Sequence, residues 1–258
     1  MLKITILGCG ASGGVPLIGC KCEVCTSTNP KNKRSRVSIL IQSKNTTILV
    51  DTSPDLREQA LKNNIIKIDA IIYTHDHADH INGIDDLRAF NYAQNAPIDA
   101  YTDAQTLARL KERFSYVFLP PAPLALGWYR PCVNPIEIKM DTPFTIGDIE
   151  VLPFEQMHGK GKTTGLRIGK FAYSTDTNGL SEHALETLTG IDTWVVDCLR
   201  KEVAPSHAHL EMTIGWINKI KPRQSYLTHM HHGFEYESFA TELPTNVAPA
   251  YDGLQFTV

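Results

Sequence analysis

Short apolar runs rich in β-branched residues alternate along the chain with stretches that repeat apolar residues at helical spacing. This alternation is typical of a protein that mixes strands with helices. With 258 residues and 42% apolar content, the chain can bury a large core. We therefore expect a single α/β domain over residues 1–258. Strands are predicted at residues 2–8, 37–43, 46–51, 69–73, 98–101, 134–138, 142–156, 163–168, 171–175, 192–197, 224–227 and after 247, and helices near 55–63, within 83–93, and at 103–112, 181–188, 210–220 and 235–242.

The densest group of reactive side chains directly follows the predicted strand at 69–73. Three histidines and two aspartates crowd into six residues, where ionisable groups repel one another unless a cation holds them. Residues two apart point the same way on an extended backbone, so His75 and His77 can bind one ion. A helical turn after them would carry Asp79 and His80 to a neighbouring position, where they can bind a second ion. The segment predicts a metal site.

Four further candidates each end an apolar run. They are Asp51, His158, Asp176 and His229. Side chains at strand ends are held rigidly, and loops at the carboxyl edge of a sheet converge on one crevice. Nitrogen and carboxylate ligands together suit zinc, manganese or iron.

The segment His75-x-His77-x-Asp79-His80 after a hydrophobic strand resembles the signature of the metallo-β-lactamase superfamily of metal-dependent hydrolases. The resemblance covers nearly the whole chain and implies an αββα sandwich, in which two mixed sheets lie between helices. It also implies two divalent ions, zinc or manganese, in adjacent sites. By the resemblance, the first ion is held by His75, His77 and His158, the second by Asp79, His80 and His229, and Asp176 bridges both.

Asp51 has two interpretations. A carboxylate behind the ligands can fix the tautomer of a metal-binding histidine, and we assign Asp51 this role. The alternative is an ordinary turn or helix-capping residue before Ser53.

Three closely spaced cysteines suggest a third metal site. No signal peptide precedes the first predicted strand, so we expect a reducing compartment in which disulfides are disfavoured. Three sulfurs around zinc need a fourth ligand for tetrahedral closure, and we expect His232, with His231 as the alternative. A full Cys3His site is structural and would pin the loop at about 9–36 to the last active-site strand. Redox-active or incidental cysteines are the other interpretation of the motif Cys20-x-Cys22-x-x-Cys25.

Together with the run from Gly8 to Pro16, this cysteine motif is similar to the PhnP-type phosphodiesterase branch of the superfamily. Members of that branch cleave phosphodiesters, including cyclic ribose phosphates. The resemblance places a catalytic histidine in the segment before the predicted helix at 210–220. A histidine can protonate the departing alkoxide, and His207 is our first choice, with His209 close behind. The candidate catalytic residues are thus His207, His209 and Asp79.

We expect hydrolysis of a small or cyclic phosphodiester by a hydroxide that bridges two metal ions. A tRNA 3′-processing-type endonuclease is the enzymatic alternative, but it should carry a basic, glycine-rich arm that the sequence lacks. The other alternative is a metal-binding protein of cofactor biosynthesis, like the B proteins of the quinone pathway. The net charge of −3 and the pI near 6.4 provide no overall basic field for nucleic acid.

Two expectations concern the surroundings of the protein. No apolar run reaches the roughly 20 residues of a membrane helix, so we expect a cytoplasmic protein with no membrane partner.

The segment 114–129 is apolar and rich in proline, and exposing it would favour association. A dimer contact, an active-site rim and packing against the body are its three interpretations. We expect a homodimer.

Overall fold

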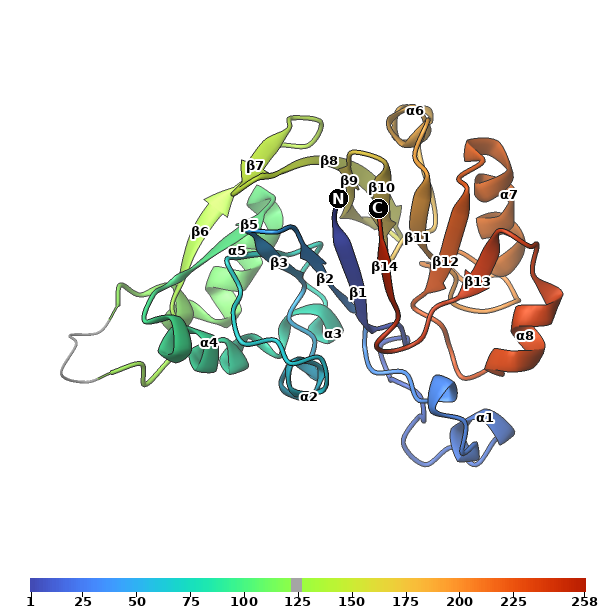
Figure 1. Ribbon diagram of the computed structural model, residues 1–258, viewed down its shortest axis with the longest axis horizontal. Coiled ribbons are helices and arrows are strands. Elements are labelled where there is room, and N and C mark those ends of the chain that lie inside the picture. Colours follow the sequence, from blue (N-terminus) through green and yellow to red (C-terminus); the bar gives the residue numbers. More distant parts are fainter. Residues whose placement is uncertain (122–126) are drawn as a thin grey trace.

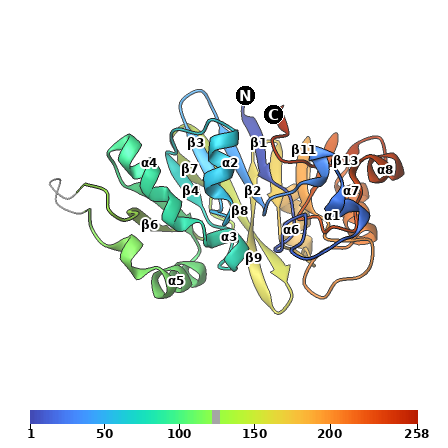
Figure 2. The ribbon, with the colours of Figure 1, turned by 90° about the horizontal axis from the view of Figure 1, so that it is seen from below.

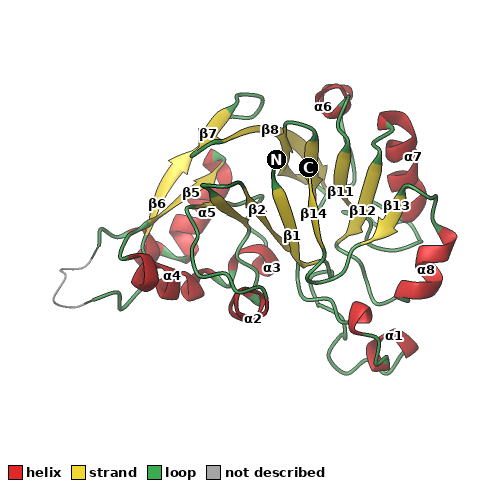
Figure 3. Ribbon diagram, viewed as in Figure 1, coloured by secondary structure: helices red, strands yellow, loops and turns green. Residues whose placement is uncertain are grey.

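The computed structural model describes residues 1–121 and 127–258 and contains two mixed sheets of seven strands each (Figures 1 and 3). This arrangement confirms the predicted αββα class. The first sheet has the order β14-β1-β2-β3-β4-β5-β6 and comprises β1 (Lys3–Gly8), β2 (Ser38–Gln42), β3 (Thr47–Val50), β4 (Ala70–Ile72), β5 (Ile98–Thr102), β6 (Val133–Glu137) and β14 (Gln255–Thr257). The second has the order β13-β12-β11-β10-β9-β8-β7 and comprises β7 (Phe144–Ile146), β8 (Ile149–His158), β9 (Gly161–Ile168), β10 (Phe171–Ser174), β11 (Thr193–Asp197), β12 (Gln224–Thr228) and β13 (Val247–Pro249).

Helices flank both sheets, as the view from below shows (Figure 2). Helices α2 to α5 lie beside the first sheet, and α6 to α8 lie beside the second (Figure 1). The short helix α1 belongs to the amino-terminal loop. The helices are α1 (Glu23–Thr26), α2 (Leu56–Lys62), α3 (Ala78–Ile81), α4 (Leu87–Gln94), α5 (Ala104–Arg113), α6 (Glu182–Leu188), α7 (Leu210–Ile220) and α8 (Tyr236–Glu242), with 3-10 turns at Pro30–Asn32, Ile84–Asp86 and Ser115–Phe118.

The alternation of apolar side chains divides the core into two layers. In β2, Ile39 and Ile41 join the cluster that also contains Phe154 and Phe171 of the second sheet. Leu40 points the other way, into the cluster formed with the helices beside the first sheet. Because side chains alternate across a strand, one apolar run supplies both layers. All of these residues are buried; the cluster of Ile39 and Ile41 holds the two sheets face to face, and that of Leu40 holds the helices against the first sheet.

Parallel pairing brings the carboxyl ends of several strands to one edge. Strands β3, β4, β5 and β6 pair in parallel, as do β10, β11, β12 and β13. The loops that follow β3, β4, β10, β11 and β12 therefore leave their sheets at shared edges, where binding crevices form.

One predicted element differs in the structure. The β segment expected at 142–156 is divided by a turn at Gly147 into β7 and β8, which pair antiparallel. Gly147 has a φ of +57°, and a Cβ there would lie 2.0 Å from Thr46 Oγ1. Only glycine fits such a turn.

Part of the apolar segment 114–129 lies outside the described residues, namely 122–126. Within the remainder, Leu119 and Tyr129 have exposed fractions of 51% and 57%. The homodimer expected from this segment stays a prediction. No helix within residues 1–121 and 127–258 is long and apolar enough to cross a membrane.

Candidate metal centre and active site

The histidine-rich segment after β4 changes from extended to helical backbone inside the motif. His77 is extended, with φ −68° and ψ 149°, and caps α3, which begins at the next residue. His75 therefore lies with His77 on the extended part, whereas Asp79 and His80 lie on the first turn of α3. The local fold thus separates one sequence motif into two ligand pairs.

Three more site residues come within two residues of the end of a parallel-paired strand and have left-handed backbone. Asp51 after β3, Asp176 after β10 and His229 after β12 have φ values of 62°, 52° and 57°. Such values are uncommon for residues other than glycine and cluster at functional sites, where the surrounding fold holds them in place. His158, by contrast, ends the antiparallel strand β8.

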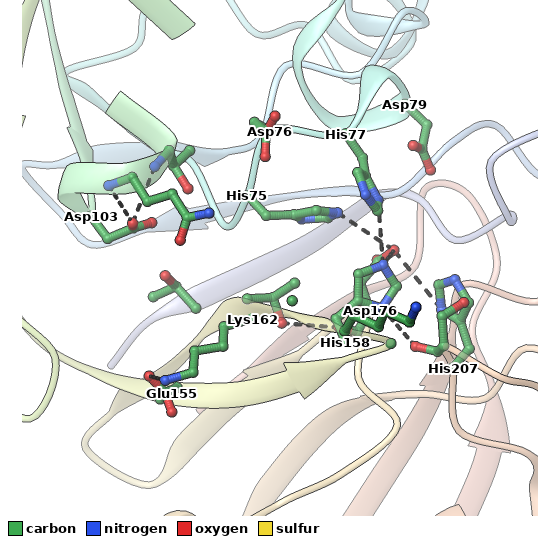
Figure 4. Close-up of a pocket in the computed structure, with 18 of the residues that line it drawn as sticks. His75, Asp76, His77, Asp79, Asp103, Glu155, His158, Lys162, Asp176 and His207 are labelled. Atoms are coloured by element: carbon green, nitrogen blue, oxygen red, sulfur yellow. Dashed lines mark hydrogen bonds and ion pairs between the residues drawn. The ribbon is translucent and has the colours of Figure 1, made fainter. Parts of the chain in front are cut away.

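The candidate ligands converge into two adjacent groups that share Asp176. Figure 4 labels the four residues of the first group and Asp79 of the second. In each group, one ligand atom from every residue lies within 4.8 Å of the others. Asp176 Oδ1 lies 3.1 Å from His80 Nε2, and its Oδ2 lies 3.4 Å from His229 Nε2 and 3.8 Å from His75 Nε2. A carboxylate in this position can bridge two ions. The first group is His75, His77, His158 and Asp176, and the second is Asp79, His80, Asp176 and His229.

The donor set fits divalent cations. Although the Asp176 carboxylate lies near them, His75 Nε2, His80 Nε2 and His229 Nε2 are buried and make no hydrogen bond among the described residues, a condition that costs free energy in a folded protein. His158 Nε2 also faces His77 Nδ1 at 3.3 Å. Ring nitrogens that converge in this way are typical of metal ligands.

The environment of the site shifts the pKa values of its ionisable side chains in both directions. Burial lowers the pKa of His75 well below its usual value, and the charge of His80 adds to the effect. Burial also lowers the pKa of His158. Although burial alone would raise the pKa of Asp176, His229 and His80 outweigh it and hold that pKa well below its usual range. Against the effect of burial, the Asp176 carboxylate raises the pKa of His80, and it raises that of His229 to about 9. Because neutral imidazoles and ionised carboxylates are the forms that bind metals, an ion bound here would displace protons from His80 and His229.

Hydrogen bonds to residues outside the two groups orient two of the candidate ligands, His80 and His158. Asp51 Oδ2 accepts a hydrogen bond from His80 Nδ1 at 2.7 Å, and this carboxylate also accepts from the backbone N–H and hydroxyl of Thr74, both at 2.8 Å. This bond fixes the tautomer of His80 and leaves its Nε2 free for an ion. Asp51 does not cap the following helix, because Asp55 is the N-cap of α2. On the other side of the site, His158 Nδ1 donates to the Ser206 carbonyl at 2.6 Å.

The structure separates the two candidate acids. His207 lines the pocket, its Nδ1 donates to Asp197 Oδ2 at 3.0 Å, and its ring stacks on His229 with centroids 4.4 Å apart. His209 is not among the pocket-lining residues and instead precedes α7 as its N-cap residue. Of the two, His207 is therefore the residue that can reach a substrate.

Asp197 is a site residue that the sequence reasoning missed. It is fully buried at the end of β11, and its Oδ2 also accepts from the Thr177 N–H at 2.8 Å. The signal was present, because Asp197 ends an apolar strand in the same way as Asp51 and Asp176.

The pocket in front of these residues has a volume of about 790 Å³. Its floor is the metal-ligand cluster, and its outer wall includes Asp103, Lys162 and Glu155 (Figure 4). Lys162 and Glu155 pair at 2.7 Å. A pocket of this size holds a small molecule.

The cysteine motif forms a separate group with a histidine from the far end of the chain. Cys20 Sγ and Cys22 Sγ lie 3.5 Å and 3.3 Å from His232 Nδ1, and Cys25 Sγ completes the group. The hydrogen bond to His232 lowers the pKa of the Cys22 thiol to about 6, which favours the thiolate that zinc binds. The alternative ligand, His231, is not in this group, and its Nδ1 accepts from the Gly233 N–H.

A buried arginine joins this loop to the segment after His229. Arg34 is 1% exposed and donates to the backbone carbonyls of His231 and Phe234 at 3.2 Å and 2.5 Å. The loop that carries Cys20, Cys22 and Cys25 is therefore attached to the segment that follows His229, a candidate active-site ligand.

Comparison with known proteins agrees with this geometry. The family model of the beta-lactamase superfamily domain matches residues 46–230. The crystal structure of a new diphosphatase from the PhnP family is 34% identical with a TM-score of 0.92, and the match covers 100% of this chain and 98% of that one. Zn(2+)-bound PqqB from Methylobacterium extorquens has a TM-score of 0.81 at 19% identity, with 99% and 100% of the two chains covered.

Two curated relatives are longer than this chain. The octanoyltransferase of Porphyromonas gingivalis is 35% identical over 258 residues, which cover 98% of this chain and 51% of that protein. Coenzyme PQQ synthesis protein B of Rhodopseudomonas palustris is 29% identical over 183 residues, which cover 62% of this chain and 54% of that protein. The chain thus spans about half the length of these curated relatives. The family match and the similarity to the diphosphatase together show that the chain belongs to the metallo-β-lactamase superfamily of hydrolases and, within it, to the PhnP family.

Proposed function

We propose that the chain is a dinuclear metal-dependent phosphodiesterase that acts on small or cyclic phosphodiesters such as cyclic ribose phosphates. The observation that carries this proposal is the placement of His207. Its ring lies in the pocket beside both ligand groups, and its Nδ1 is fixed by Asp197. A diester with an alkyl leaving group requires a proton donor, whereas a thioester releases a thiolate that leaves without one.

The seven residues of the two ligand groups would hold two divalent ions, zinc or manganese. When bound, such ions lower the pKa of a water molecule and neutralise charge on the phosphoryl oxygens. Asp176 belongs to both groups and would bridge the two ions, and Asp51 and the Ser206 carbonyl keep His80 and His158 in their orientations.

The chain supplies the acid. Because His207 Nδ1 donates to Asp197, Nε2 is the nitrogen left to give a proton to the departing alkoxide. The buried Asp197 carboxylate stabilises the protonated ring before the transfer and keeps it oriented. No covalent intermediate with a side chain is needed.

A diphosphate is the second candidate substrate, because the 34% identical structural relative is described as a diphosphatase. The same residues would serve, since a diphosphate also presents a phosphorus between two bridging oxygens. Its phosphate leaving group depends less on protonation than an alkoxide does, so His207 would contribute less to its cleavage.

The test is elemental analysis followed by a substrate panel. The panel contains bis(p-nitrophenyl) phosphate, cyclic ribose phosphates, cyclic nucleotides, a dinucleoside diphosphate, a thioester and pre-tRNA. We expect turnover of the small diesters, and we expect His207→Ala to reduce it most strongly for alkyl leaving groups. Preferred cleavage of the thioester or pre-tRNA, or full activity of the His207→Ala protein on alkyl diesters, would contradict the proposal.

A further inference from the structure

Two segments far apart in sequence meet at the rim of the site. The loop between β11 and α7, residues 198–209, carries His207. The tip of the β8–β9 hairpin carries His158 and Gly159. The loop reaches the tip through Ser206, whose carbonyl accepts from His158 Nδ1, and a Cβ on Gly159 would lie 3.3 Å from Ser206 Cβ. The proton donor and a first-ion ligand therefore depend on the same contact.

One side chain bonds to both segments. Asn178 Nδ2 donates to the Pro205 carbonyl at 2.8 Å, and its Oδ1 accepts from the Gly159 N–H at 3.1 Å. Its own backbone N–H donates to the Met157 carbonyl at 2.9 Å, which anchors it to β8. Asn178 follows the bridging Asp176 by two residues, so it is itself fixed at the site. It is half-buried and is not among the residues that line the pocket.

We propose that Asn178 is a positioning residue that holds the loop of His207 against the hairpin tip of His158. This inference rests on the proposed function, because it assigns Asn178 a role in placing the acid for phosphodiester cleavage. The residue type fits the role, since an amide offers a donor and an acceptor on one planar group. In Asn178→Asp the side chain can still accept from the Gly159 N–H, but it places an oxygen instead of an N–H donor against the Pro205 carbonyl. In Asn178→Ala both hydrogen bonds are lost.

Loss of the two side-chain hydrogen bonds of Asn178 should displace His207 more than it displaces the metal-ligand residues. His207 lies on the loop, whereas five of the seven metal-ligand residues lie on elements that Asn178 does not contact; the exceptions are His158 and Asp176, which shares the segment of Asn178. A misplacement of about 1 Å can reduce a rate by about 100-fold. The loss should therefore appear with substrates whose leaving group needs a proton and be small where it does not.

The experiment compares two substrates in a double-mutant cycle. Asn178→Ala and Asn178→Asp are made in wild-type and His207→Ala backgrounds and assayed with a cyclic nucleotide, which releases an alkoxide, and with bis(p-nitrophenyl) phosphate, which does not. Asn246→Ala is the matched control, because Asn246 is also half-buried and donates to a proline carbonyl, Pro222, at 3.2 Å outside the site. Hydrogen exchange of residues 199–207 is measured on metal-free protein.

We expect both Asn178 variants to lose about 10- to 100-fold in kcat on the cyclic nucleotide and less than about threefold on bis(p-nitrophenyl) phosphate. In the His207→Ala background the further loss should vanish. Exchange over 199–207 should become faster, and Asn246→Ala should match the wild type in every assay.

Equal losses on both substrates, additive losses with His207→Ala, or unchanged hydrogen exchange would overturn the inference. If no diester is hydrolysed by the wild type, the proposed function fails by itself. The hydrogen-exchange comparison then still decides whether Asn178 holds the loop, because it needs neither metal nor turnover.

Discussion

Substitution of Asp197 by asparagine tests the proton donor most specifically. Asp197 is fully buried, and its Oδ2 accepts from His207 Nδ1 at 3.0 Å and from the Thr177 N–H at 2.8 Å. Asparagine preserves the shape of the side chain and one acceptor oxygen, but it removes the negative charge. The ligand groups are expected to keep their geometry, because Asp197 belongs to neither of the two that share Asp176.

The size of the effect follows from the hydrogen bond that loses its charge. A hydrogen bond with one ionised partner contributes about 1.5–3 kcal/mol and a neutral one about 1 kcal/mol, so loss of the charge costs about 0.5–2 kcal/mol. Each 1.36 kcal/mol in a barrier is about tenfold in rate, so kcat should fall about 2- to 30-fold. The loss should apply only where His207 must deliver a proton. For p-nitrophenolate, which leaves without one, we expect kcat to stay unchanged.

The assay measures kcat for a cyclic nucleotide and for bis(p-nitrophenyl) phosphate at saturating metal, with metal content verified. Asp69→Asn is the control, because Asp69 Oδ2 also accepts a backbone N–H at 2.8 Å, from Thr47, away from the pocket. An equal loss on both substrates would mean that Asp197 maintains the metal centre rather than the acid. No loss on either substrate would refute the assignment of His207 as the donor.

Three further predictions concern metal binding and stability. Asp51→Asn weakens the bond that orients His80, so competition with a chelator should show about 10- to 100-fold weaker binding of one active-site ion. Cys22→Ser should remove one zinc per chain in elemental analysis and lower the melting temperature by about 5 °C or more; unchanged zinc would refute that site. Burial raises the pKa of Asp252 to about 6, above its unfolded value, so the folded state binds more protons and stability falls as pH rises from about 4 to 6. In urea unfolding of the metal-free proteins, the free energy of unfolding of Asp252→Asn should fall about 2–3 kcal/mol less over this pH range than that of the wild type. The same pH dependence in both proteins would contradict the reasoning.

Residues that carry their chemistry in one short segment could be predicted from the sequence. The motif from His75 to His80 and the three cysteines are dense enough to predict metal binding from the sequence alone. The strands around them were also predictable, because buried parallel strands form continuous apolar runs. The turn at Gly147 was not, since the close approach of Thr46 that demands glycine is a tertiary contact.

Single residues with one distant partner were harder to predict. Asp197 ends its strand as Asp51 does, but no pattern shows that it faces His207. The choice between His207 and His209 depended on how the loop before α7 folds against the hairpin tip, a contact made through Ser206. Asn178 has no sequence signal, because both of its partners are backbone atoms.

Anomalous diffraction from crystals grown with manganese and zinc tests the central claim most directly. We predict two peaks about 3.5–4 Å apart on either side of Asp176, within reach of His80 on one side and His158 on the other. A third peak, of zinc, should lie between the three cysteines and His232. A single active-site peak, or ions bound away from Asp176, would contradict the dinuclear centre on which the proposed chemistry depends.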